Sequence, residues 1–284
     1  MASASGNSGW PCRLAFSTLG APDWSIRRVA DAVAAYGYDG IELRLLGGAL
    51  IEATAVDQET REDVASVLGR ADVPIVCLDT SARLFGTSTR LAGGDSYAEL
   101  QAAIELAHEW EAPFVRVFGG ELDPEVRQGS AYDEIGDRLV PLLDVAETLG
   151  VCIVLETHDS FSSAASVAKL LNDIAHPSLG ALWDIRHTWA QGELPEEAVA
   201  LLGDRLRLVH VKDDRSTADA MDLCLLGEGR VPVQESLSAL RRSGYTGWVS
   251  VEWEKLWHPG LPEPEVALPQ HAELLHEWME SATT

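Results

Sequence analysis

Short apolar runs alternate with longer amphipathic stretches along almost the whole chain. The runs are four to six residues long and nearly continuously apolar, which is typical of parallel strands that are covered on both faces. In the stretches between them, apolar residues recur at three- and four-residue intervals, as on a helix with one buried face. The pattern predicts eight strands, at Arg13–Ser17, Gly40–Leu43, Ile75–Asp79, Phe114–Phe118, Val151–Glu156, Leu179–Asp184, Leu206–Val211 and Trp248–Glu252.

Amphipathic helices are predicted between these strands. Turn residues stand just before several strands, as at Gly37, Pro113 and Gly150, and they mark one end of the sheet as its structural face. An alternation of strand and helix predicts an α/β fold with a parallel sheet, either a closed barrel or an open, doubly wound sheet. The clearest predicted helices are Ile26–Tyr36, Thr60–Arg70, Tyr97–Trp110, Tyr132–Leu149, Val233–Arg242 and Pro264–Met279.

Four potential metal ligands lie at or near the ends of the last four predicted strands. Glu156, Asp184, His210 and Glu252 are separated by 28, 26 and 42 residues, and each interval suits about one strand-plus-helix unit. A closed barrel brings the carboxyl ends of different strands to one mouth, whereas a four-way convergence is awkward across an open sheet. The 284 residues also fit one barrel of about 250 residues. We therefore expect a single (β/α)8 TIM barrel over residues 11–284, after a flexible tail at residues 1–10.

Three carboxylates and one imidazole are the donor set of a divalent metal site. Taken alone, each residue also fits a strand-end acid or a core histidine, but three clustered carboxylates repel one another unless a cation holds them together. His210 precedes the polar run Lys212–Asp214, which indicates that its strand emerges from the core there. An oxygen-rich site with open positions favours Mn²⁺, with Mg²⁺ or Co²⁺ as alternatives, over a closed structural zinc site.

Polar and aromatic residues near these ligands are candidates for holding a polyol substrate. Lys212 follows His210 by two residues and should point the same way. The arginines that end the second and fourth strands have an alternative role, in structural ion pairs with Glu42 or Glu121. The predicted substrate contacts are His158, His187, Lys212, Arg44, Arg116 and, from loops, Trp189 and Trp257.

The chain is strongly acidic, with 45 Asp and Glu against 21 Lys and Arg and a net charge of −24. Such a charge repels phosphate backbones and anionic membrane surfaces, so we expect no nucleic acid and no membrane partner. No GxGxxG follows the first strand and no GxxxxGK[ST] occurs, so no nucleotide cofactor is expected. The first ten residues lack the features of a secretory signal, and no apolar run could span a membrane, which predicts a cytoplasmic protein.

The four ligand positions lie in segments that resemble a known family. LETHD, WDIRH, HVKD and VEWEK resemble the sugar isomerase/epimerase group of the xylose-isomerase-like barrel superfamily, and YDGIELR and RVFGG resemble that group's second and fourth strands. The resemblance spans residues 13 to 280 and implies one Mn²⁺, Co²⁺ or Mg²⁺ held by Glu156, Asp184, His210 and Glu252. It also implies that the two glutamates form the acid/base pair and that His187 contacts the substrate.

Apurinic-site endonucleases of the same superfamily depart from this sequence at two strands. Those enzymes use a trinuclear zinc cluster, with extra histidines from their third and fourth strands. The corresponding strand ends here, Cys77–Ser81 and Arg116–Gly120, contain no histidine. Together with the acidic net charge, this departure argues against a DNA-repair enzyme.

The predicted function is a metal-dependent isomerase or epimerase of a sugar, a sugar derivative or a polyol. Proton removal beside a metal-bound carbonyl or hydroxyl would give an enediolate, with Glu156 and Glu252 moving protons on opposite faces of the substrate carbon. A first alternative is a lyase on the same site, such as an inosose or dehydroshikimate dehydratase or a carbon–glycoside-cleaving enzyme. A second alternative is a noncatalytic sugar-binding module. A homo-oligomer, dimer or tetramer, stays open.

Overall fold

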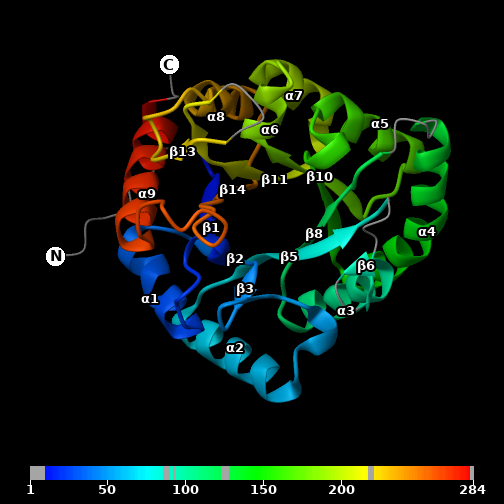
Figure 1. The fold of residues 1–284 in the computed structure, drawn as a ribbon, viewed down its shortest axis with the longest axis horizontal. Helices are drawn as coiled ribbons and strands as arrows, with labels where there is room; N and C mark the ends of the chain where they lie inside the picture. The colour runs from blue at the N-terminus through cyan, green and yellow to red at the C-terminus, as the bar shows by residue number, and fades with distance from the viewer. Residues whose placement is uncertain (1–9, 86–89, 92–93, 123–127, 217–220, 282–284) are drawn as a thin grey trace.

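A closed barrel of eight parallel strands forms the centre of the molecule, with helices around it (Figure 1). The computed structural model describes residues 10–85, 90–91, 94–122, 128–216 and 221–281. Every neighbouring pair in the barrel is parallel, and β1 closes the ring by pairing with both β2 and β14. In spatial order the barrel strands are β1 (Arg13–Ser17), β14 (Trp248–Val251), β11 (Leu206–Val211), β10 (Leu179–Asp184), β9 (Cys152–Glu156), β8 (Phe114–Phe118), β5 (Ile75–Arg83) and β2 (Gly40–Leu43).

Helices follow the strands in sequence and cover the outside of the barrel (Figure 1). Serine side chains cap the first helix and the fifth, because Ser25 and Ser163 accept hydrogen bonds from backbone N–H groups of the first turn. The helices are α1 (Ile26–Tyr36), α2 (Gln58–Ala71), α3 (Ser96–Glu109), α4 (Gln128–Leu149), α5 (Ala164–Ile174), α6 (Ile185–Ala190), α7 (Pro195–Leu202), α8 (Val233–Arg242) and α9 (Pro264–Ser281).

Short elements outside the barrel belong to the connecting loops. Three two-stranded ribbons and four single turns of 3₁₀ helix occur in the described part of the chain. The ribbons are β3 (Leu45–Leu46) with β4 (Ala49–Leu50), β6 (Arg90–Leu91) with β7 (Gly94–Asp95), and β12 (Asp213–Asp214) with β13 (Leu223–Cys224). The 3₁₀ turns are η1 (Thr18–Gly20), η2 (Ala53–Ala55), η3 (Asp159–Phe161) and η4 (Gly203–Arg205).

The predicted barrel is confirmed, with small differences at the ends of its elements. β5 continues to Arg83, four residues beyond its predicted end, and β14 stops one residue before Glu252. The prediction that Trp189 lies on a loop was wrong, since this residue belongs to the short helix α6. Asp184 caps that helix by accepting a hydrogen bond from the backbone N–H of His187, so the chain becomes helical directly after β10.

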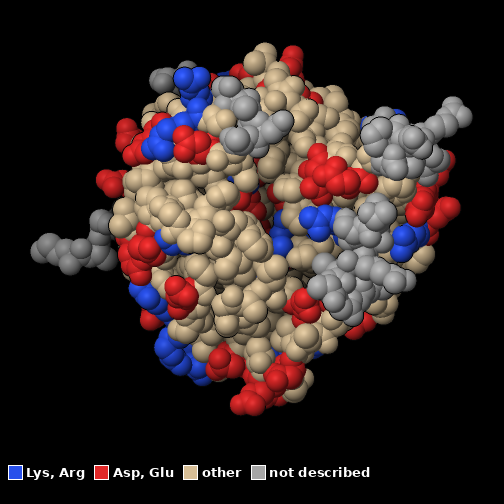
Figure 2. Space-filling model, viewed as in Figure 1, with Lys and Arg blue, Asp and Glu red and all other residues tan. Residues whose placement is uncertain are grey.

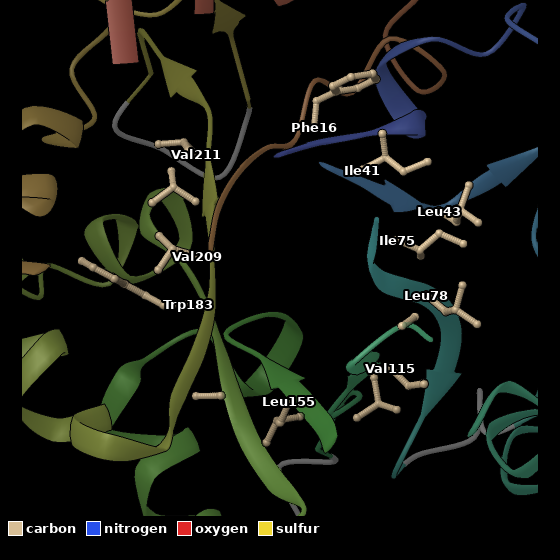
Figure 3. Close-up of a cluster of buried hydrophobic side chains, with 14 of the residues drawn as sticks. Phe16, Ile41, Leu43, Ile75, Leu78, Val115, Leu155, Trp183, Val209 and Val211 are labelled. Carbon is tan, nitrogen blue, oxygen red and sulfur yellow. The ribbon is translucent and has the colours of Figure 1, made fainter. Parts of the chain in front are cut away.

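Apolar side chains form two separate layers, one on each side of the barrel wall. The outer layer packs strand residues such as Phe16 and Trp183 against the helices, and Figure 3 shows both among its buried side chains. The inner layer alternates with it along the same strands, as Ala15 and Leu182 do. Trp248 is the largest member of the inner layer. These side chains fill the half of the barrel interior that lies toward the amino ends of the strands. The polar side chains inside the barrel therefore lie toward the carboxyl ends.

The N-terminal tail predicted for residues 1–10 lies outside the described residues except for Trp10. This tryptophan is buried, and its Nε1 donates a hydrogen bond of 2.6 Å to the carbonyl of Tyr245. Over the described ranges, none of the helices is both long enough and apolar enough to cross a bilayer.

Candidate active site and metal centre

The four predicted ligands occupy one inward-facing layer at the carboxyl end of the barrel. Glu156, Asp184 and His210 each stand two residues beyond a member of the inner apolar layer, and strand pairing places Asp184 beside His210. Glu252 follows β14 directly. One potential ligand atom from each side chain lies within 4.8 Å of the other three, and all four side chains are buried. The structure therefore brings together residues that are up to 96 positions apart in the sequence.

Two of these ligand atoms have no hydrogen-bond partner among the described residues. They are Oδ2 of Asp184 and Nδ1 of His210. The other polar atom of each side chain is held, because Asp184 Oδ1 accepts from the His187 N–H at 3.1 Å and His210 Nε2 lies 3.1 Å from Glu42 Oε2. A buried polar atom without a partner is costly. Both atoms instead have charged neighbours, since Asp184 Oδ2 lies 2.8 Å from Lys212 Nζ and His210 Nδ1 lies 3.5 Å from Glu252 Oε2. A divalent cation would replace these contacts and use the lone pairs of the two atoms.

The imidazole of His210 is protonated on both nitrogens in the metal-free protein at neutral pH. Burial lowers the pKa of its imidazole, but Glu42 and Glu252 lie close enough to outweigh this effect and hold the pKa well above its usual range. A metal that binds Nδ1 must displace this proton, because only the neutral ring has a lone pair to offer.

Lys212, together with the protonated His210, provides positive charge in the ligand layer when no metal is bound. Its Nζ lies 2.8 Å from Asp184 Oδ2, 2.5 Å from Glu252 Oε2 and 2.7 Å from Glu254 Oε1. Burial lowers the pKa of this ammonium group, but the surrounding carboxylates, Asp184 first, hold the pKa well above its usual range. Sequence analysis missed Glu254, although it stands two residues after Glu252 and so projects to the same side of an extended chain.

The two glutamates of the layer differ in their proton affinity. Burial raises the pKa of Glu156, and the pairing with Arg116 at 2.7 Å only partly opposes this effect. Burial also acts to raise the pKa of Glu252, but Lys212 and His210 hold it well below the usual range. Glu252 is thus an anion in the metal-free protein, whereas Glu156 is the more easily protonated of the pair. Such a separation is common in acid/base pairs.

A cavity of about 260 Å³ opens at the barrel mouth above the ligand layer. Five of the seven predicted substrate contacts line it, among them Trp257, which is half exposed. The described residues that line the cavity are Leu19, Arg44, Arg116, Phe118, Glu156, His158, Lys212, Met221, Glu252, Glu254, Trp257 and His258.

The two remaining predicted contacts, His187 and Trp189, are not among the described residues that line this cavity. The ring of His187 lies edge-on to the ring of His158, with centroids 4.7 Å apart, and burial lowers its pKa to about 3 against the opposing effect of Asp184. His187 is therefore a neutral group beside the ligand layer. Trp189 packs against the apolar core, so its predicted stacking on a sugar lacks support from its position.

The two predicted arginines reach the cavity from strands outside the ligand set. Arg116 on β8 donates from Nη1 to Glu156 Oε2 and places its guanidinium 4.1 Å from the centroid of the Phe118 ring. Arg44, which follows β2, donates from Nη1 to the carbonyl of Asp79 at 2.8 Å. The alternative ion pairs with Glu42 or Glu121 do not form in the described part of the chain.

Two further carboxylates, Glu42 and Asp79, lie inside the barrel next to the ligand layer. The sequence predicted no site role for them, and Glu42 was considered only as the partner of a structural ion pair. Both are fully buried. Burial, together with the charge of Glu42, raises the pKa of Asp79 to about 7. Each is an acid within a strand that is otherwise apolar, in GIEL and IVCLD. A buried acid there is costly without a partner, and that cost is the signal that could have identified both.

Comparisons with known proteins give one family and several related enzymes. A fructoselysine 3-epimerase from Shigella flexneri is 24% identical over 231 residues, which are 76% of this chain and 80% of the relative. An inosose dehydratase 2 from Bacillus cereus is 30% identical over 151 residues, which are 47% of this chain and 50% of the relative. The solved structure of the IOLI protein with a bound zinc atom superposes with a TM-score of 0.79 at 18% identity, over 96% of this chain and 99% of the other.

The family match extends over most of the barrel. The model of the xylose isomerase-like TIM barrel family matches residues 30–280. This range contains seven of the eight barrel strands and all four residues of the ligand layer. The chain therefore belongs to the xylose isomerase-like TIM barrel family.

Proposed function

We propose that this chain is a divalent-metal-dependent isomerase or epimerase that acts on a sugar, a sugar derivative or a polyol. The observation that carries the proposal is the convergence of Glu156, Asp184, His210 and Glu252 in one buried layer, where one potential ligand atom from each lies within 4.8 Å of the other three. The similarity to a fructoselysine 3-epimerase supports the reaction class, and the zinc in the IOLI structure supports a divalent ion. We expect Mn²⁺ here, with Mg²⁺ or Co²⁺ as alternatives.

Isomerisation and epimerisation beside a carbonyl begin with the removal of a proton from carbon. When bound, the ion would supply Lewis-acid stabilisation of the negative charge that develops on adjacent substrate oxygens. Glu156 and Glu252 each have one oxygen held, by Arg116 and Lys212 respectively, and both line the cavity. In the proposed reaction one carboxylate takes the proton and the other carboxyl group returns a proton to the opposite face of the carbon.

The rest of the cavity would position the polyol and limit access of water. His158 is fixed by a contact of 2.8 Å between its Nδ1 and Asp159 Oδ1, which leaves Nε2 to meet a hydroxyl. Burial lowers the pKa of His158, but Asp159 and Glu156 outweigh this effect and raise it. Phe118 and Trp257 add apolar surface to the lining, and aromatic faces of this kind pack against the C–H side of a sugar ring.

A lyase on the same site is the second candidate, and the similarity to inosose dehydratase 2 favours it. Removal of the same kind of proton, followed by departure of water or an aglycone from the neighbouring carbon, would change only the leaving group. The two reactions differ in the mass of the product, which an elimination reduces and an isomerisation does not.

The test is a panel of ketoses, aldoses and cyclitols incubated in D₂O with the Mn²⁺-loaded protein. We expect one compound to incorporate solvent deuterium at a single carbon by NMR, with no loss of water or aglycone in the mass spectrum. Asp184→Asn should abolish the exchange, and the exposed Glu235→Gln should leave it unchanged. Loss of water would assign the lyase instead. Tight sugar binding without any exchange would assign a noncatalytic binding module and contradict both.

A further inference from the structure

Arg44 stands across the barrel from the ligand layer and lines the same cavity. In the closed ring, β2 lies opposite β10, which ends in Asp184, with β1, β14 and β11 on one side and β5, β8 and β9 on the other. A molecule that binds at the ligand layer with one end therefore presents its other end to Arg44. Arg116 on β8 reaches the cavity between these two points.

Arg44 is a buried cation that has no ion pair among the described residues. The residue is 6% exposed, and among the described residues its guanidinium makes one hydrogen bond, to the backbone carbonyl of Asp79. Burial and the nearby Arg116 lower the pKa of Arg44 to about 9 against the opposing effect of Asp79, so the guanidinium is still charged at neutral pH. A buried charge without a direct ion pair is unfavourable. The geometry thus leaves the remaining N–H groups of Arg44 available to an anion that enters the cavity.

Arg116 adds a second guanidinium with spare hydrogen-bond donors. Its Nη1 is committed to Glu156, but its buried Nε has no partner among the described residues. Its flat face covers the Phe118 ring, which fixes the plane of the group and the direction of its N–H bonds. A fixed guanidinium at Arg116 beside a second guanidinium at Arg44 suits a planar anion, since a guanidinium binds a carboxylate through two parallel hydrogen bonds.

A bound metal would remove the excess negative charge around the cavity, which would otherwise repel an anion. Arg44, Arg116 and Lys212 balance Glu156, Glu252 and Glu254. Asp184 and Glu42 add two negative charges beneath the cavity and a divalent ion would add two positive charges, so the formal charge of these groups around the cavity would rise from about −2 to about 0 on loading. Figure 2 shows Lys and Arg atoms inside the hollow at the centre of this face, although the whole chain carries −24.

We propose that the substrate is a sugar acid, whose carboxylate Arg44 and Arg116 bind across the cavity from the ligand layer. This assignment rests on the proposed function for the reacting end of the substrate. A carboxylate fits better than a phosphate for two reasons. The guanidinium of Arg116, held flat against Phe118, matches the plane of a carboxylate, and no α-helix begins at a described residue of the cavity lining, whereas phosphate sites commonly use helix N-termini.

The experiment compares matched acid and neutral sugars by isothermal titration calorimetry. The probes are D-glucuronate and D-galacturonate against D-glucose and D-galactose, with D-glucose 6-phosphate as the phosphate probe, each with Mn²⁺-loaded protein and again with EDTA. The variants are Arg44→Met and Arg44→Lys. Arg13→Met is the matched control, because Arg13 opens β1 at the opposite end of the barrel. Arg44→Met removes an unpaired buried charge and should fold at least as stably as the wild type.

We expect at least one acid to bind tenfold more tightly than its neutral partner to the wild type. Arg44→Met should reduce this ratio to nearly one, Arg44→Lys should keep part of it because it keeps the charge without the planar fork, and Arg13→Met should leave it unchanged. The proposal is overturned if no acid shows the preference, if Arg44→Met retains it, or if the 6-phosphate shows a larger one.

The two proposals fail in different ways. Binding is measured without turnover, so an acid preference without deuterium exchange would contradict the catalytic function and support the carboxylate subsite. Exchange on neutral sugars without an acid preference would contradict the subsite and support the catalytic function.

Discussion

Glu42 holds the ring of His210 by a contact of 3.1 Å between Oε2 and Nε2, inside a barrel where both side chains are fully buried. The contact directs Nδ1 toward the ligand layer, because the two nitrogens lie on opposite sides of the imidazole. A carboxylate behind a metal-binding histidine fixes its orientation and strengthens its lone pair.

Glu42→Gln tests this relationship through metal affinity rather than through activity. The amide is nearly the same size but is uncharged, so we expect the Kd for Mn²⁺ to rise about 10–100-fold, measured by isothermal titration calorimetry. Glu59→Gln on the exposed surface of α2 is the control and should leave the Kd unchanged. An unaltered Kd in Glu42→Gln would show that His210 needs no support from this acid.

Metal binding itself should stabilise the fold and release a proton. We expect about one divalent ion per chain, and removal of the ion by EDTA should lower the free energy of unfolding by about 2.7 kcal/mol relative to protein in an ion concentration 100 times the Kd. Because His210 is protonated in the metal-free protein, titrations in buffers of different ionisation enthalpy should detect proton release on binding.

Asp184→Asn is the matching variant for the metal site. It keeps the cap of α6 through an amide oxygen but removes one anionic ligand, so it should bind the ion more weakly and lose most of the EDTA effect on Tm. A metal-to-chain ratio and an EDTA effect equal to those of the wild type would exclude Asp184 as a ligand.

Lys212 should stabilise the metal-free state more than the loaded state. Lys212→Met leaves Asp184, Glu252 and Glu254 without their shared cation, and breaking a buried pair of this kind costs about 3–5 kcal/mol. The Tm difference between variant and wild type should shrink when Mn²⁺ is added, because the ion then neutralises two of these acids. Lys169→Met removes an exposed pair with Asp173 and serves as the control. Equal Tm losses with and without Mn²⁺ would contradict this role.

The barrel and the ligand layer could be predicted from sequence because each is set by a repeating local pattern. Continuous apolar runs define parallel strands, and a ligand-type residue at or near a strand's carboxyl end must project into the mouth of a closed barrel. Glu156 and Asp184 end strands that were predicted to within one residue. Their convergence follows from the closure of the ring and needs no knowledge of loops.

The supporting residues could not be predicted, because their partners depend on distances between strands. Glu42 meets His210 across 168 positions of sequence. The pairing of Lys212 with Asp184, Glu252 and Glu254 depends on the stagger of the strands in the closed barrel. The same stagger places Arg44 against the carbonyl of Asp79 rather than in an ion pair. Trp189 was misplaced for a local reason, since the Asp184 cap begins a helix where a loop was expected.

Substitution of Glu156 or Glu252 by glutamine should separate the loss of proton transfer from the loss of metal binding. Gln keeps an oxygen that can bind the ion but cannot accept a proton at neutral pH, so Glu156→Gln and Glu252→Gln, each saturated with Mn²⁺, should lose about 10²–10⁴-fold in turnover. For an epimerase the two variants should differ in deuterium incorporation from the two epimers, because each carboxyl group serves one face. A saturated variant with nearly wild-type turnover would remove that glutamate from proton transfer.

Acid should destabilise the fold through His271, which is buried in α9 against the ring of Trp253. Burial lowers the pKa of its imidazole to about 4 against the opposing effect of the Ala267 carbonyl, whereas the unfolded chain titrates near 6.5. Between these values the unfolded state binds a proton that the folded state does not, so stability falls by roughly 3 kcal/mol as the pH drops from about 6.5 to about 4.

His271→Phe should remove this acid sensitivity while keeping a ring against Trp253. The variant also removes the Nε2 atom, which has no hydrogen-bond partner in the described part of the chain. At pH 8 the imidazole of His271 is neutral in both the folded and the unfolded wild type. The difference in Tm between variant and wild type at that pH therefore reports packing alone. Any further divergence between pH 6.5 and 4.5 reports the titration of His271, and the variant's Tm should fall less steeply over that window. Parallel Tm curves for the two proteins would show that the folded protein takes up a proton at His271 as readily as the unfolded chain does.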